Sequence, residues 1–285
     1  MFEGFEASLS ESIFIRRKGV GPPLLLLHGF PENHLMWHRV APVLSEHFTV
    51  ICADLPGYGS SAETAPNKSA MALAMMRMMR AQGFSRFSIA GHDRGARLAY
   101  RLALDHADNV ERLVLLDIVP TAEVFERADM RFALAFWPWS LLAQPEPLPE
   151  RLIAADPEAI VDDALSAWGS DRAAFPAEIR RAYVDALRDR AHSICEEFRA
   201  AATLDLARDR ADRKANRRIA CPVLVLWSAD SALDTWYGDE GGPLGIWRAW
   251  ADDVRGHAVA GGHFFPEANA SVTAEALRSF FLQRR

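Results

Sequence analysis

Residues 87–97 read FSIAGHDRGAR, an apolar strand that passes through the pattern G-x-D-x-G, centred on Asp93, into a helical segment. The flanking glycines, Gly91 and Gly95, are typical of a strand-to-helix turn that is too tight for side chains at those positions. At the start of a helix, free backbone N–H groups and the helix dipole favour a negative charge. The pattern predicts that Asp93 is a nucleophile. The alternative is a glycine-flanked turn with a capping aspartate.

An aspartate nucleophile predicts a different reaction from a serine at the same place. A carboxylate is ionised at neutral pH, so it can attack an sp3 carbon without a base to remove a proton first. Displacement of a leaving group then yields an aspartyl ester. Hydrolysis of that ester requires a general base that activates water near the ester carbonyl. Asp93 therefore indicates a two-step hydrolysis rather than esterase or amidase chemistry.

Apolar runs bounded by turn residues predict the strands of a buried, mainly parallel sheet. The runs are Leu24–Leu27, Phe48–Ala53, Phe87–Ala90, Leu113–Leu116 and Val223–Trp227. Helical patterns fall between most of them, and a further one ends the chain, which is typical of βαβ units. Residues 1–119 and 219–285 are therefore predicted to form one α/β core, with helices flanking a mostly parallel sheet.

Residues 120–218 interrupt this alternation. They contain helical segments, the proline-rich turn QPEPLPE at 144–150 and several tryptophans, but no convincing strand pattern. We predict a helical cap inserted into the sheet. The last stretch of this region, ARDRADRKANRR at 207–218, is a charge run, which is typically a solvated helix face.

One histidine and two further carboxylates are candidates to act with Asp93. Asp117 directly follows an apolar run, and Asp230 occupies the corresponding place after the next one, so both are candidates for the acid that orients a histidine. His263 lies in the loop GGHFFPE before the last helix, which suits an imidazole that must reach water and an orienting carboxylate. The order nucleophile, acid, histidine predicts a catalytic triad.

Arg94 and Arg97 lie where the helix dipole opposes a positive charge, which calls for an explanation. Their spacing places both side chains on one helix face beside Asp93, where they can bind a carboxylate. A structural salt bridge at one of them is the alternative. The backbone N–H groups of Phe30 and Arg94 are expected to stabilise an oxyanion. A substrate with a carboxylate and a leaving group on the adjacent carbon is a 2-haloacid.

Composition and charge restrict the partners of the protein. The chain of 285 residues has a net charge of −6, so we expect neither nucleic acid nor a membrane as a partner. The first residues lack a secretory signal pattern, and no run approaches the roughly 18 apolar residues of a membrane span. The three cysteines are an odd number without metal-ligand spacing. We expect a cytoplasmic enzyme with a small anionic substrate, no metal and no cofactor.

Over nearly its whole length the chain resembles the fluoroacetate and haloacetate dehalogenases of the α/β-hydrolase superfamily. The matching stretches are HGFPENHLMWHRVAP, ADLPGYGSS, AGHDRGAR, LLDIVPT, WSLLAQPEPLPE and GGHFFPE. The resemblance implies the α/β-hydrolase fold and a triad of Asp93, Asp117 and His263, which favours the first of the two candidate acids. It also implies that Arg94 and Arg97 bind the substrate carboxylate, and that the protein is a homodimer.

The halide-binding end departs from the family pattern. The family's fluoride pocket uses a His-Trp pair and a Tyr from the cap, and the matching positions here are Pro138, Trp139 and Phe198. Trp168 matches a cap tryptophan that lines the family's pocket. Fluoride is a poor leaving group with strongly localised charge, so it depends on donors that act as it departs. We therefore expect chloroacetate and bromoacetate to be better substrates than fluoroacetate.

Other functions of the same fold remain open at this point. An epoxide hydrolase shares the aspartate nucleophile but needs acids, usually cap tyrosines, to protonate the opening oxygen, and the predicted cap contains only Tyr183. A haloalkane dehalogenase usually has Trp after the nucleophile, where this chain has Arg94. A non-catalytic relative would keep the fold without turnover, and the intact triad argues against it.

Overall fold

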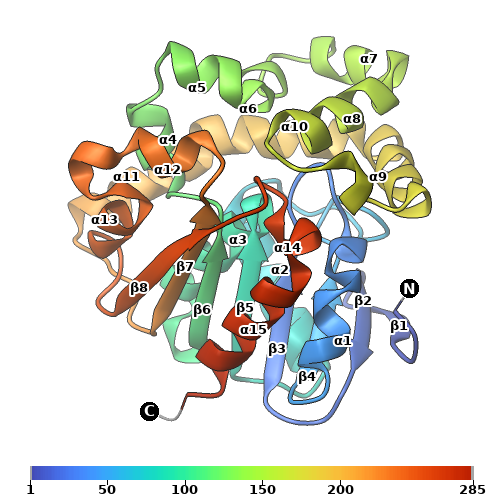
Figure 1. Ribbon diagram of the computed structural model, residues 1–285, viewed down its shortest axis with the longest axis vertical. Coiled ribbons are helices and arrows are strands. Elements are labelled where there is room, and N and C mark those ends of the chain that lie inside the picture. Colours follow the sequence, from blue (N-terminus) through green and yellow to red (C-terminus); the bar gives the residue numbers. More distant parts are fainter. Residues whose placement is uncertain (1, 284–285) are drawn as a thin grey trace.

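The computed structural model describes residues 2–283, apart from the side chain at position 172, and is built around an eight-stranded sheet (Figure 1). The strands are β1 (Glu6–Ser10), β2 (Ile13–Lys18), β3 (Pro23–Leu27), β4 (Thr49–Ala53), β5 (Phe87–His92), β6 (Val110–Leu116), β7 (Val223–Ser228) and β8 (Val254–Val259). They lie in the order β1-β2-β4-β3-β5-β6-β7-β8. The β1–β2 and β2–β4 pairs are antiparallel and the other neighbours are parallel. The predicted α/β architecture with a mostly parallel sheet is confirmed.

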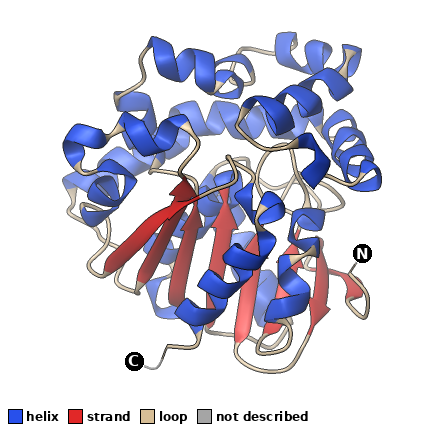
Figure 2. Ribbon diagram, in the orientation of Figure 1, coloured by secondary structure: helices blue, strands red, loops and turns tan. Residues whose placement is uncertain are grey.

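Helices cover both faces of this sheet (Figure 2). On one face α1 (Val40–Leu44) packs against α15 (Ala270–Phe281), and on the other α2 (Lys68–Ala81) packs against α3 (Asp93–Asp105). Because the central strands are buried on both sides, they read as nearly continuous apolar runs in the sequence. The buried methionines of α2 belong to the same core, as their helical spacing predicts.

The segment between β6 and β7 lies over the carboxyl ends of the strands (Figure 1). Its α-helices are α4 (Thr121–Glu126), α5 (Met130–Ala135), α6 (Trp137–Leu141), α7 (Leu148–Ala155), α8 (Pro157–Ala167), α9 (Ala177–Asp189), α10 (Ala191–Ala200) and α11 (Leu206–Lys214). A π-helical turn at Ala201–Asp205 joins α10 to α11, so that one continuous helix returns the chain from the cap to the core. We call this helical segment, which lies in the region predicted to be a cap, the cap.

Three shorter helices complete the loops around β8. They are α12 (Ala232–Trp236), α13 (Gly242–Arg248) and α14 (Phe265–Ala268). Single 3-10 turns lie at His34–His38, Ala107–Asn109, Arg172–Ala174 and Gly238–Glu240. Of these elements, α14 bears most directly on the candidate site, because it follows the loop that carries His263.

The strand order reverses at β3, whose neighbours are β4 on one side and β5 on the other. Loops that leave adjacent strands in opposite directions open a crevice at the carboxyl ends, which is where ligands bind in open α/β sheets. Phe30 follows β3, Asp93 follows β5 and Asp117 follows β6. The topology therefore brings these candidate residues to one edge of the sheet.

The apolar runs do not predict β1, β2 or β8, which lie at or next to the two edges of the sheet. β1 is exposed along most of its length, and exposed and partly buried residues alternate in β8. The turn between β1 and β2 also lacks the glycine or asparagine that usually indicates a tight hairpin turn. Glu11 and Ser12 adopt its positive φ angles instead, 49° and 65°. Apolar runs thus identify strands buried on both faces and miss strands that face solvent.

The turn between β5 and α3 is as tight as its glycines predict. A Cβ added to Gly95 would lie 2.4 Å from the backbone oxygen of His28 and 2.6 Å from that of Leu27. One added to Gly91 would lie 2.5 Å from the carbonyl carbon of Gly95. Asp93, at the tip, has a φ of 42°, a left-handed conformation that is strained for a residue with a side chain. The start of α3 is therefore in backbone contact with the end of β3.

Gly95→Ala is expected to lower the free energy of unfolding by about 3 kcal/mol, because backbone atoms cannot yield as a flexible side chain does. Gly238→Ala is the matched control: a Cβ there meets nothing within 4 Å, and the change should stay within about 1 kcal/mol. Urea unfolding monitored by tryptophan fluorescence measures both. Equal stabilities of the two variants would contradict the close approach of α3 to β3.

Candidate active site

A cavity of about 500 Å³, including its open mouth, lies at the carboxyl ends of the strands. Its titratable side chains are Asp93, Arg97, Asp117, Tyr237 and His263. The rest of the lining is apolar or aromatic: Phe30, Ile118, Val119, Val124, Phe132, Phe136, Pro138, Trp139, Trp168, Phe198, Leu233 and Trp236. A mostly apolar cavity with a few convergent polar groups is the usual form of a small-molecule site.

Asp93 is buried at the base of this cavity, and one of its oxygens is already held. The backbone N–H of Phe30 donates to Asp93 Oδ2 at 3.1 Å. Burial on its own would raise the pKa of the Asp93 carboxyl, but the attraction of His263, Arg94 and Arg97 outweighs it and holds that pKa below its usual value. The carboxylate is therefore ionised and oriented, as a nucleophile must be.

His263 is paired with Asp117 and not with Asp230. The ring Nδ1 of His263 lies 2.6 Å from Asp117 Oδ2, and the backbone N–H of Ser228 donates to Asp117 Oδ1 at 2.7 Å. Asp230 is exposed and instead accepts from the backbone N–H of Gly261 at 3.0 Å, where it stabilises the histidine loop. The structure thus brings Asp93, Asp117 and His263 together in one cavity and leaves Asp230 outside it.

The loop that carries His263 is docked on the cap. The backbone N–H of His263 donates to the backbone oxygen of Trp168 at 2.8 Å. A Cβ added to Gly262 would lie 2.3 Å from the carbonyl carbon of Gly169, so the two backbones are in contact. The indole of Trp168 also packs edge-on against the His263 ring, with centroids 5.2 Å apart. The position of the imidazole therefore depends on cap and core together.

Arg94 forms a buried ion pair with a carboxylate from the cap. Its Nε donates to Glu197 Oε2 at 2.8 Å, and its Nη2 donates to Glu197 Oε1. Glu197 also accepts from the hydroxyl of Tyr58 and the Nζ of Lys68, and these side chains are all buried. Only Nη1 of Arg94 lacks a partner among the described residues. Arg94 thus has little left to offer as half of a carboxylate-binding fork, and its predicted binding role remains a prediction.

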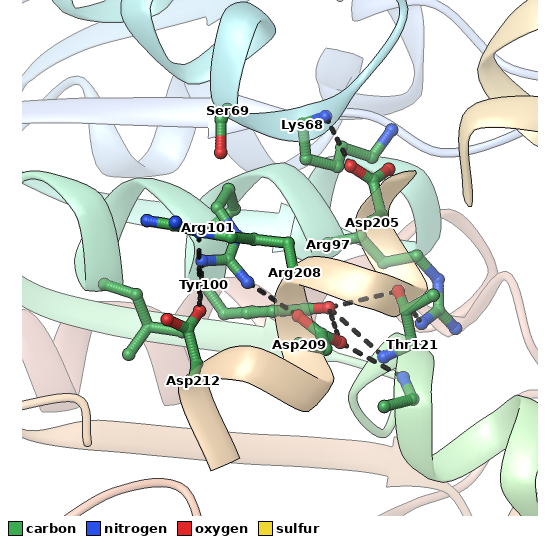
Figure 3. A network of polar contacts seen from close by, with 12 residues as sticks. Lys68, Ser69, Arg97, Tyr100, Arg101, Thr121, Asp205, Arg208, Asp209 and Asp212 are labelled. Atoms are coloured by element: carbon green, nitrogen blue, oxygen red, sulfur yellow. Dashed lines mark hydrogen bonds and ion pairs between the residues drawn. The ribbon is translucent and has the colours of Figure 1, made fainter. Parts of the chain in front are cut away.

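Arg101 of α3 faces acidic side chains on the returning helix (Figure 3). Arg101 is held between Asp209 and Asp212, and the hydroxyl of Tyr100 donates to Asp209 Oδ2 at 2.8 Å. Both aspartates come from the charge run at 207–218 and are almost fully buried. The interpretation of that run as a solvated face is therefore wrong for its acidic side: those residues are buried and neutralise Arg101 of α3.

Arg97, between these paired arginines, has no carboxylate partner among the described residues. Its Nη1 donates to the backbone oxygen of Val119 at 3.0 Å and to Thr121 Oγ1 at 3.3 Å, and its Nε is buried without a partner. The guanidinium lies over the Trp139 ring, 4.3 Å from its centroid. Burial, reinforced by the repulsion of Arg94, lowers the pKa of Arg97 to about 10. A buried cation that lines a cavity and lacks an anion is a candidate binding site for one.

All the residues predicted for the halide pocket line the cavity, namely Pro138, Trp139, Trp168 and Phe198. The indole N–H of Trp168 is occupied, because it donates to the backbone oxygen of Ala135 at 2.8 Å. Proline and phenylalanine have no side-chain donor. Trp139 therefore carries the only free donor of this set, since no hydrogen bond from its indole N–H is found among the described residues.

Two polar residues of the site are missed by motif reading. Glu197 precedes Phe198 on α10, and the available signal for it is indirect: arginines at spacings of three and four on a buried helix require counter-charges from elsewhere. Tyr237 follows α12 and lines the cavity with no motif to indicate it. Burial raises the pKa of Tyr237 to about 12. Tyr183, the tyrosine considered as a cap acid, is buried elsewhere, against Glu267.

Within residues 2–283, no cluster of three or more histidine, cysteine or acidic side chains has the arrangement of a metal site. Over the same residues, no helix has the length and apolar character needed to cross a membrane.

Comparison with known proteins places this fold and site in a class. A family model described as the alpha/beta hydrolase fold matches residues 22–240, and the chain belongs to that family. It is 40% identical, over 299 aligned positions, to a fluoroacetate dehalogenase from Burkholderia sp., with 100% of this chain and 96% of that protein covered. Within the α/β hydrolases, the chain therefore belongs to the fluoroacetate and haloacetate dehalogenase family.

Solved structures with the same fold include proteins described in other terms. One is a protein from Nostoc sp. PCC 7120 that is provisionally described as an α/β hydrolase. It superposes with a TM-score of 0.95 at 41% identity, with 100% of both chains covered. A variant of a Pseudomonas aeruginosa protein, provisionally described as an epoxide hydrolase and with MFA bound, gives 0.92 at 42% identity, covering 98% of this chain and 96% of that one. These similarities support a hydrolase, and they include both dehalogenase and epoxide hydrolase descriptions.

The two arginines at the site are expected to differ in their contribution to stability. Arg94→Gln should lower the free energy of unfolding by about 3 kcal/mol, because it breaks a buried ion pair. Arg97→Gln should change it by less than about 1 kcal/mol, or raise it, because it removes a buried charge that no carboxylate compensates. Urea unfolding at pH 7 measures both. Similar losses in the two variants would show that Arg97 is as well compensated as Arg94.

Proposed function

We propose that this protein hydrolyses small 2-haloacids such as haloacetate, through an ester on Asp93. The observation that carries the proposal is the presence in one cavity of an ionised carboxylate, Asp93, and a buried cation without a carboxylate partner, Arg97. A 2-haloacid supplies the anion for Arg97 and, on the adjacent carbon, a leaving group for Asp93. The similarity to a fluoroacetate dehalogenase supports the same reaction class.

In the first step an oxygen of Asp93 attacks the 2-carbon of the substrate. The new C–O bond forms as the carbon–halogen bond breaks, and the halide leaves with the bonding electron pair. Because the Phe30 N–H already holds Oδ2, we assign Oδ1 as the attacking atom. The product is an aspartyl ester, and no proton has to be moved in this step.

In the second step His263, oriented by Asp117, takes a proton from water, and the resulting hydroxide attacks the ester carbonyl carbon. Negative charge develops on Oδ2, where the N–H of Phe30 lies, with the N–H of Arg94 as the second predicted donor. Collapse of this intermediate breaks the ester C–O bond. The departing alkoxide takes the proton from His263, Asp93 loses its own, and a 2-hydroxy acid is released with one oxygen of water left in Asp93.

Of the two arginines predicted to bind the substrate carboxylate, Arg94 and Arg97, we propose that Arg97 makes the main contact. Arg97 binds the substrate carboxylate directly, because its Nε is free and it lines the cavity. Arg94 is neutralised by Glu197, so its part is limited to Nη1 and to its effect on Asp93. Because Arg97 is the one cation of the cavity lining without a carboxylate partner among the described residues, the site is expected to prefer substrates with one carboxylate.

The leaving group is the part of the substrate that receives least help. Trp139 is the only free donor among the predicted halide-pocket residues, since Trp168 is occupied and Pro138 and Phe198 have none. Chloride and bromide disperse their charge and leave without much assistance, whereas fluoride concentrates it. We therefore propose chloroacetate and bromoacetate as better substrates than fluoroacetate.

Epoxide opening is a second candidate, favoured by one observation. Tyr237 lines the cavity with a buried hydroxyl that could protonate an opening epoxide oxygen, and its pKa of about 12 keeps it protonated at neutral pH. Structures described as epoxide hydrolases are also among the similar proteins. Against this candidate, an epoxide offers no anion to Arg97.

Halide release from chloroacetate and bromoacetate is expected to exceed release from fluoroacetate by about 100-fold in kcat/KM, which is the effect of losing one or more charge-stabilising donors. Ion-selective electrodes or ion chromatography on the purified protein measure all three. Equal rates on fluoroacetate would contradict the leaving-group argument, and no halide from any of them would contradict the dehalogenase proposal. Asp93→Asn, which removes the nucleophile, is the inactive control.

In His263→Gln, mass spectrometry should find the carboxymethyl ester on Asp93.

Arg97→Gln and Tyr237→Phe separate the two candidate functions. For a 2-haloacid, Arg97→Gln should raise KM by about 10- to 100-fold, the worth of one charge-assisted pair, while Tyr237→Phe has a smaller effect. For an epoxide such as styrene oxide, Tyr237→Phe should cause the larger loss and Arg97→Gln little change. Steady-state kinetics of both variants on both substrates decide between them. The second pattern, or turnover of the epoxide alone, would favour an epoxide hydrolase.

A further inference from the structure

A second layer of buried polar groups lies behind Asp93 and His263. It begins with His92, which precedes the nucleophile and is fully buried. The ring Nδ1 of His92 lies 3.0 Å from Glu32 Oε2, and its Nε2 lies 2.9 Å from the backbone oxygen of His263. A backbone oxygen only accepts, and an ionised carboxylate only accepts. With Glu32 ionised, both ring nitrogens face acceptors, and His92 makes both hydrogen bonds only as an imidazolium.

Two buried glutamates extend this layer, and neither has a role in the proposed reaction. Glu32 follows the oxyanion turn in the HGFPE stretch, and Glu267 follows the histidine in GGHFFPE. Their exposed fractions are 1% and 0%. Among the described residues, Oε1 of neither side chain has a hydrogen-bond partner, and His38 Nδ1 lies 3.7 Å from Glu267 Oε1. Burial and the charge of Glu32 raise the pKa of Glu267. Two buried carboxyls that repel each other do not both stay ionised, so one of the two is a carboxylic acid.

The neighbours of each glutamate indicate which one carries the proton. Glu32 Oε2 faces two donors, the ring of His92 and the backbone N–H of Gly29 at 3.2 Å, as expected of an ionised carboxylate. Glu267 Oε2 faces only the hydroxyl of Tyr183, at 3.1 Å, and burial followed by the charge of Glu32 raises the pKa of Glu267 well above its usual value. A charged His92, an ionised Glu32 and a neutral Glu267 together carry no net charge, as a fully buried cluster should.

Other titratable groups also face His92. The carboxylates of Asp93 and Asp117 favour its charged form, and the His263 ring lies 4.6 Å away between centroids. Burial would lower the pKa of His92, but Glu32 and these carboxylates raise it above its usual value. In return, the His92 charge is among those that lower the pKa of Asp93. The electrostatic surroundings therefore agree with the hydrogen-bond geometry.

We propose that His92 is a permanently charged positioning residue, held by an ionised Glu32 beside a protonated Glu267. This cluster fixes three segments relative to one another: the oxyanion turn through Glu32, the nucleophile elbow through His92, and the histidine loop through the carbonyl of His263. Tyr183 on α9 attaches the cap to the same cluster. Its effect on catalysis rests on the roles proposed for Asp93 and His263, whereas its charge state does not.

The charge state is tested directly by NMR of protein labelled with 15N in its histidine rings. The His92 signals are assigned from the His92→Gln variant. We expect both ring nitrogens of His92 at imidazolium shifts from pH 7 to pH 8, and the same in Glu267→Gln, because the amide is neutral as the acid is. A neutral ring in the unmodified protein at pH 7 would overturn the proposal, whatever the enzyme's activity. This arm therefore stands even if no haloacid is turned over.

Kinetics of isosteric variants test the positioning role. Glu32→Gln should lower kcat for the haloacid by about tenfold or more with KM little changed, because it removes the anion that holds His92 without altering the cavity. Glu267→Gln should cause a smaller loss, and Glu46→Gln, on the surface, is the control for loss of a glutamate. Equal losses at 32 and 267, or a Glu32→Gln variant with unchanged kcat, would overturn it. If Glu32→Gln does not fold, the NMR comparison of the unmodified protein with Glu267→Gln still decides.

Discussion

The rest of the site depends on the ion pair between Arg94 and Glu197, which is buried between the helix of the nucleophile and the last helix of the cap. Charges placed there must be paired, because unpaired ions are costly away from water. The returning helix supplies the anions in sequence: Glu197 from α10, then Asp209 and Asp212 from α11. Figure 3 shows the last two beside Arg101. The cap is thus tied to α3 by charge as well as by packing, and the roof of the cavity is set relative to its base.

One cation is excluded from this pairing, and the proposed specificity rests on it. Arg97 lies between Arg94 and Arg101 on α3, but no acidic residue of the returning helix pairs with it. Burial lowers the pKa of Arg97, as expected where keeping the charge in the folded protein costs stability. A substrate carboxylate would remove that cost on binding, as a counter-ion does in the other pairs. The stability given up at Arg97 is therefore available as binding energy, a trade-off common at functional sites.

The core of the fold and the grouping of the candidate catalytic residues follow from local sequence patterns, whereas the charge pairing does not. The glycines around Asp93 and the apolar runs predict the elbow and the central strands because both reflect constraints within a few residues. Strand-end position alone leaves Asp117 and Asp230 equivalent, since both follow a strand, and only the path of the histidine loop separates them. Glu197 lies 103 residues from Arg94, so its role depends on how the cap packs. The charge run at 207–218 misleads because its acidic face is complementary to a buried partner helix.

The two ends of the cavity differ in how many hydrogen-bond donors they offer, and this difference bears on which substrates fit the site. Around Asp93, the oxyanion turn, His92 and the His263 loop are held by several hydrogen bonds from different strands, so the attacking geometry is closely fixed. At the leaving-group end, aromatic rings replace donors. Tyr237 is not counted as a donor to the leaving group, because the charged residue that affects it most is Arg97, at the carboxylate end of the cavity. For the proposed reaction, a substrate therefore needs a leaving group that departs with little assistance, and recognition falls on the acid group beside it.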